Sequence, residues 1–98
     1  MASNTGTAVG YSSANITSQA TTLVKSGVGI LQSLIFNKPT ATAVITLYDG
    51  IDANGTKLGT ITIPASPQPF TLKYERAVTT GITVVTATAD SDITVTFI

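Results

Sequence analysis

From about residue 20 onward, apolar and polar side chains alternate in short runs with the two-residue period of a β-strand. The alternation is clearest at 41–48, where Ala43, Ile45 and Leu47 share one parity and Thr42, Val44, Thr46 and Tyr48 the other. Threonine, valine and isoleucine dominate these runs, and branched side chains suit strands better than helices. The pattern predicts strands at 21–25, 28–37, 41–48, 57–63, 70–75, 77–87 and 93–98.

Turn-forming residues separate the runs. The segment 49–56 contains two glycines and an Asn-Gly pair, so we expect a loop that joins its flanking strands as an antiparallel hairpin or across two sheets. The segment 64–69 holds three prolines and is expected to cross between layers or follow an edge. Gly81 is expected to mark a bulge or bend within the run 77–87. The fold class predicted is all-β, a single small β-sandwich or jelly roll of seven to eight strands with an extended N-terminal arm.

The run 28–37 is apolar on both parities. Ile30, Leu34 and Phe36 share one, and Leu31 and Ile35 share the other. This pattern predicts a strand buried on both sides, or buried on one side and covered by a partner subunit on the other. The residues expected between two sheets are Ile45, Leu47, Ile61, Ile63, Leu72, Tyr74, Ile82, Val84, Val95 and Phe97.

Residues 1–19 are small and polar, and they show neither a helical nor a strand period. Such a segment buries too little apolar surface to offset its ordering entropy, which predicts a flexible or docking arm at 1–19 and a β-sandwich domain at 20–98. Its spaced apolar residues Val9, Tyr11 and Ile16 are the candidate partner contacts. The alternative is a terminal tail with no role.

The chain has five basic and five acidic residues and no net charge. Too few cations are present to neutralise many phosphates, so a nucleic-acid partner is not expected. Apolar runs as short as Leu34-Ile35-Phe36 predict no membrane span, and residues 1–7 do not resemble a secretion signal. A domain of 98 residues without cysteine has a thin stability margin, which favours a homo-oligomer over the alternative, a weakly charged monomer.

Catalytic chemistry is not expected from this composition. Histidine and cysteine are absent, which removes the commonest general base, the thiolate nucleophile and the usual zinc ligands. No enzyme activity, cofactor or metal site is therefore predicted. Asp49, Asp52 and Asn54 lie in one loop and raise calcium as an alternative, but their spacing does not match an EF-hand, and turn formation explains them.

Three aromatic residues raise a sugar-stacking platform as an alternative. Phe70 and Tyr74 lie on the parity expected to face inward, and the chain has no tryptophan. A core role is therefore favoured for Tyr48, Phe70 and Tyr74.

Four segments carry a resemblance to a known class of protein. They are 24–37, 43–50, 55–61 and 80–86, and their most distinctive order is a strand, Tyr48-Asp49-Gly50, a loop, Gly55-Thr56-Lys57 and a second strand. This order resembles small structural proteins of tailed bacteriophages, in particular capsid decoration (cement) proteins. The resemblance covers most of residues 20–98 and contains no active-site motif.

The resemblance implies a virion protein, made in the host cytoplasm, that sits as a homotrimer on the outer capsid surface. Its partners would be the major capsid protein and other copies of itself, and its function would be to stabilise the head. A tail, baseplate or fibre module is the first alternative, and a carbohydrate-binding or Ig-like adhesion module is the second.

Overall fold

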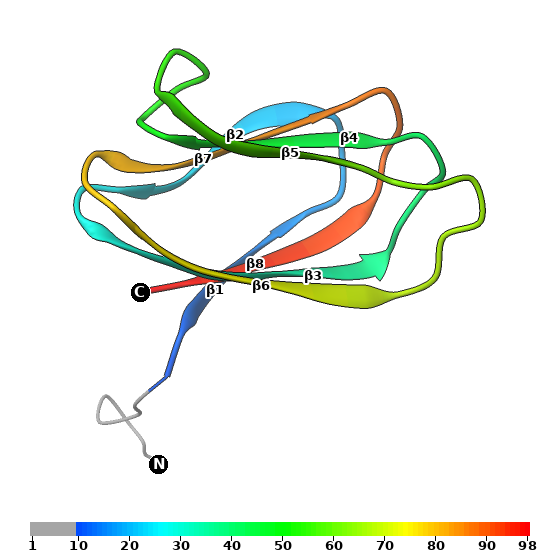
Figure 1. Cartoon of the computed structure of the whole chain (residues 1–98), viewed down its shortest axis with the longest axis horizontal. Coiled ribbons are helices and arrows are strands. Elements are labelled where there is room, and N and C mark those ends of the chain that lie inside the picture. Colours follow the sequence, from blue (N-terminus) through cyan, green and yellow to red (C-terminus); the bar gives the residue numbers. More distant parts are fainter. Residues whose placement is uncertain (1–9) are drawn as a thin grey trace.

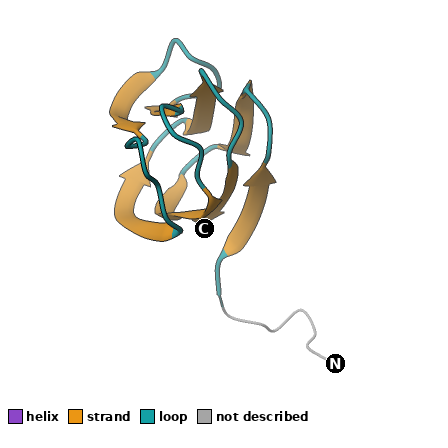
Figure 2. Ribbon diagram, turned by 90° about the vertical axis from the view of Figure 1, so that its right-hand side faces the viewer, coloured by secondary structure: helices purple, strands orange, loops and turns teal. Residues whose placement is uncertain are grey.

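The computed structural model describes residues 10–98, which form eight β-strands in two antiparallel four-stranded sheets. The two sheets lie face to face as a sandwich (Figure 1), and strands and loops make up the whole described chain (Figure 2). The strands are β1 (Ser12–Ile16), β2 (Ala20–Ser26), β3 (Gly29–Lys38), β4 (Val44–Asp49), β5 (Thr56–Thr62), β6 (Phe70–Val78), β7 (Gly81–Ala87) and β8 (Asp92–Phe97). The predicted all-β sandwich is confirmed.

The strand order is that of a jelly roll. One sheet has the order β1-β8-β3-β6 and the other β2-β7-β4-β5. The first strand pairs with the last, the second with the seventh, the third with the sixth and the fourth with the fifth. The first four strands therefore pair in reverse order with the last four, which is the double Greek-key arrangement of eight-stranded jelly rolls.

The core lies between the two sheets. Of the ten residues predicted to face it, six are buried, namely Ile45, Leu47, Ile63, Ile82, Val84 and Val95. The other four, Ile61, Leu72, Tyr74 and Phe97, are partly buried and pack against the same cluster. The period-two pattern therefore predicted the inward face correctly on β4, β5, β6, β7 and β8.

The expectation that the run 28–37 is buried on both sides by the chain itself is wrong, because Ile30 is 40% exposed and β3 contains a bulge. Cover of one side by a partner subunit stays a prediction. The register against β8 passes from Leu31 to Ser33 while β8 advances by one residue, so Gln32 is extra. In a regular strand Leu31 would face away from Leu34 and Phe36. The shift at Gln32 brings all three side chains into the core. Apolar residues at both odd and even positions of β3 therefore lie on the same buried face.

The predicted boundary of the arm at residue 19 is also wrong. β1 pairs with β8 over five consecutive residues, from Ser12 opposite Phe97 to Ile16 opposite Ile93. Ile16 is only 5% exposed and belongs to the core cluster. A five-residue strand with one buried apolar side chain carries too weak a period to be seen in the sequence, and its pairing with β8 supplies the missing order.

The run 77–87 forms parts of two strands rather than one. β6 ends at Val78 in one sheet and β7 begins at Gly81 in the other, so the chain crosses the sandwich through Thr79 and Thr80. Two other connections match expectation: β4 and β5 pair as an antiparallel hairpin, and the proline-rich segment 64–69 crosses between the sheets.

Candidate interaction site

Three connections and the last residue meet at one end of the sandwich, on the left in Figure 1. Backbone hydrogen bonds join them. The Gly27 amide donates to the Thr80 carbonyl at 2.8 Å, and the Gly50 amide donates to the Gly81 carbonyl at 3.1 Å. Gly27 has φ of +94°, a conformation that a residue without a side chain adopts easily. The β2–β3, β4–β5 and β6–β7 connections are therefore held against one another at this end.

The Asp49 carboxylate organises the same end. It accepts backbone hydrogen bonds from Thr80 at 2.9 Å, from Thr79 at 3.1 and 3.2 Å, and from Gly81 at 3.4 Å. The Thr80 and Thr79 amides lower the pKa of Asp49 from its ordinary value, because they favour the charged form. One carboxylate thus fixes the crossing between β6 and β7 to the end of β4.

The outer face of the β1-β8-β3-β6 sheet carries an exposed apolar row at this end. Phe97 packs against the core, so its chain neighbour Ile98 lies on the outer side. Ile30 and Ile98 exchange two backbone hydrogen bonds of 3.0 Å, and the pairing of Ser12 with Phe97 brings Tyr11 beside Ile98. The exposed fractions are 54% for Tyr11, 53% for Ile98 and 40% for Ile30. We call these three side chains the apolar row.

The area around the apolar row is also apolar. Val28, in the adjacent β2–β3 connection, is 77% exposed, the highest value among the exposed large hydrophobic residues. Ala77, which pairs with Ile30 on β6, is exposed as well. Exposed apolar side chains gathered at one end of a sheet are typical of a protein contact surface rather than of a catalytic centre.

The three partner-contact residues predicted from the sequence have different positions. Tyr11 is exposed and belongs to the apolar row, whereas Ile16 is in the core and is not available to a partner. Val9 lies outside the described residues. Sequence reasoning missed Ile30, Ile98 and Val28. For Ile30 the reason is the bulge at Gln32, which changes which residues of β3 face outward.

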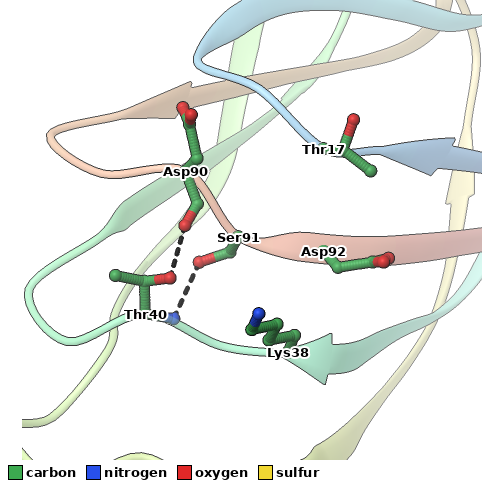
Figure 3. Close-up of a pocket in the computed structure, with 6 residues that line it drawn as sticks. All are labelled: Thr17, Lys38, Thr40, Asp90, Ser91 and Asp92. Atoms are coloured by element: carbon green, nitrogen blue, oxygen red, sulfur yellow. Dashed lines mark hydrogen bonds between the residues drawn. The ribbon is translucent and has the colours of Figure 1, made fainter.

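The opposite end of the sandwich is polar and contains an open hollow of about 260 Å³ (Figure 3). Its lining residues are Thr17, Lys38, Thr40, Asp90, Ser91 and Asp92. Both carboxylates already accept hydrogen bonds from the protein. Asp90 accepts the Gln19 amide at 3.0 Å, and Asp92 accepts Asn15 and Asn37 side-chain donors at 2.7 and 3.1 Å. Thr40 joins the β3–β4 connection to the β7–β8 connection. Its hydroxyl donates to the Asp90 carbonyl, and its backbone amide donates to Ser91 Oγ.

In the loop 49–56, the side chains of Asp49 and Asp52 hydrogen-bond to backbone amides. Asp52 accepts the Asn54 amide at 2.8 Å, an Asx turn, while Asp49 is occupied as described above. Between residues 10 and 98 no three acidic side chains gather closely enough to hold a metal ion.

Phe70 and Tyr74 have the core role expected for them, whereas the core role expected for Tyr48 is wrong. Phe36 and Phe70 stack with ring centroids 4.4 Å apart, and Phe70 and Tyr74 pack against the core. Tyr48 is half-buried on the outer side of β4.

Comparison with known proteins gives no relative: no family model, no curated protein and no solved structure matches the chain. In the described part of the chain, no helix is long and apolar enough to cross a membrane. The geometry of the sandwich and its surfaces is therefore the basis for a functional proposal.

Proposed function

We propose that this protein is a virion structural protein that decorates and stabilises the outside of an icosahedral phage capsid as a homo-oligomer. The observation that supports the proposal most is the apolar row, whose three side chains are 40 to 54% exposed at one end of the sandwich. The jelly-roll topology is compatible with it, since capsid proteins use this architecture, although lectins and other classes use it too.

The physical demands on such a protein are modest. Each copy needs a contact surface that excludes water when bound. Binding at many equivalent positions of a shell raises the effective concentration of each contact, so that individually weak contacts hold together. The apolar row provides that surface, and zero net charge allows neutral copies to lie close together. The major capsid protein is the partner that this proposal places against the apolar row, with the trimer remaining the oligomer that the family resemblance predicts.

Particles assembled without the protein test the proposal. Added purified protein should bind the heads and raise the temperature at which packaged DNA is released. The variant Ile98→Lys should bind more weakly, because it places a charge within the apolar row. Leu23→Lys is the matched control, since Leu23 is 49% exposed on the other sheet and should be replaced without loss of binding.

Three outcomes would contradict the proposal. Particles that neither bind the protein nor gain heat resistance would remove the decoration function. Equal loss of binding by both lysine variants would show that the apolar row is not the contact. Binding at the tail alone would favour the tail, baseplate or fibre alternative.

A further inference from the structure

The two sheets have four edge strands, and three of them carry features that block further strand pairing. β6 contains Lys73, Glu75 and Arg76, and Glu75 has φ of +49° at a register shift against β3. β5 contains Lys57 and pairs with β4 through another shift. β2 contains Lys25 and has a shift against β7. Charged side chains and bulges are the usual protection of an exposed sheet edge.

The fourth edge strand, β1, has none of these features. Its sequence Ser-Ser-Ala-Asn-Ile contains no charge and no proline, and its five pairs with β8 follow one another without a shift. Within residues 10–98 no strand lies on its other side. An uncharged edge strand without a bulge leaves backbone donors and acceptors in a regular row, which is the template that an additional strand requires.

We propose that β1 of a second copy of this chain pairs antiparallel with β1 about a two-fold axis. Full overlap of two five-residue strands places Ala14 opposite Ala14 of the partner subunit, and Ser13 opposite Asn15 of the partner subunit. The two β1-β8-β3-β6 sheets then form one continuous eight-stranded sheet. The contact uses the same strand on both copies, so it closes as a dimer and does not extend into a fibre.

A second copy is the occupant that the charges favour. Neither strand has a charged side chain, so the pairing sets no like charges opposite each other, and the whole chain has no net charge to keep copies apart. The inference does not depend on the capsid proposal, because it concerns the purified chain alone. It differs from the trimer predicted by the family resemblance, and the mass of the oligomer distinguishes the two.

The chain contains no cysteine, so a single introduced thiol reports the register directly. Directly opposed residues in an antiparallel pair have Cα atoms about 4.5 to 5.5 Å apart, which a disulfide can span. Under mild oxidation, Ala14→Cys should therefore give a covalent dimer in high yield. Ser13→Cys is the control: its Cα atoms would lie on a diagonal at roughly 7 to 8 Å, and its yield should be at least several-fold lower.

Sedimentation equilibrium of the full chain supplies the second measurement. The wild type should dissociate from dimer to monomer on dilution. Ser12→Lys with Ser13→Lys, which guards the exposed β1 edge as the other edges are guarded, should weaken the dimer by tenfold or more. Thr60→Lys with Thr62→Lys adds the same charge to the exposed edge β5 and should leave dimerisation unchanged.

A wild type that stays monomeric at high micromolar concentration would overturn the proposal. So would equal cross-linking yields from Ala14→Cys and Ser13→Cys, or a thiol at position 14 that is shielded from reagents without cross-linking. The last result would show that another segment, such as residues 1–9, occupies the edge. A trimer insensitive to the β1 lysines would also contradict the pairing and support the oligomer expected from the resemblance.

Discussion

Replacing Ile16 by alanine tests whether β1 belongs to the fold. The side chain is 5% exposed and lies opposite Ile93, which is fully buried. The substitution deletes three carbon atoms, and at about 0.8 kcal/mol for each buried methylene the lost transfer energy is about 2.4 kcal/mol. A residual cavity adds to this cost, while partial collapse at the sheet edge reduces it. The expected loss in the free energy of unfolding is about 2 to 4 kcal/mol.

Urea unfolding followed by far-ultraviolet circular dichroism measures this loss at a fixed, low protein concentration. The midpoint should fall while the slope with urea stays constant, which indicates a change in stability rather than in the unfolded state. Ser13→Ala, an exposed position of the same strand, should change stability by less than about 0.5 kcal/mol. A change below about 0.5 kcal/mol for Ile16→Ala as well would refute the placement of Ile16 in the core.

Three further predictions follow from single contacts. Asp49→Asn should make stability depend less on acidic pH. Folding lowers the pKa of Asp49, so its charged form stabilises the protein above the ordinary value of 3.8, and this contribution is lost as the pH falls through the lower folded value. Melting temperatures from pH 5 to pH 2 should therefore fall less steeply in the variant than in the wild type. Thr83→Val should cost about 1 to 3 kcal/mol in urea unfolding, since the buried Thr83 hydroxyl donates to the Gly50 carbonyl at 2.8 Å; an unchanged midpoint would show that this bond contributes nothing. Adding EDTA should leave the melting temperature unchanged, and a decrease would show that a metal ion supports the fold.

The sequence predicted the fold class and most of the core because the period of two is strong where one face is buried. Ile45 and Leu47 on β4, and Val95 on β8, follow that period without interruption. Alternation of this kind is a local property of the chain. It needs no knowledge of which strands are neighbours.

Features that depend on the neighbouring strand could not be read in the same way. The bulge at Gln32 becomes visible only in the register of β3 against β8, and it decides that Ile30 faces outward. The strand β1 acquires its order from pairing with β8, and Ile16 acquires its burial from the same contact. The crossing at Thr79 and Thr80 is stabilised by hydrogen bonds to the Asp49 carboxylate, which lies thirty positions before Thr79. Contacts between distant segments therefore determined the candidate site.

The position of the chain in an intact particle tests the proposed function most directly. If the proposal holds, image reconstruction of a tailed-phage particle from cells that make this protein should show the jelly roll on the outer surface of the head, with Tyr11, Ile30 and Ile98 turned toward the major capsid protein. Its presence only on the tail, its absence from the particle, or its attachment to the head through another face with the apolar row exposed to solvent would contradict the account.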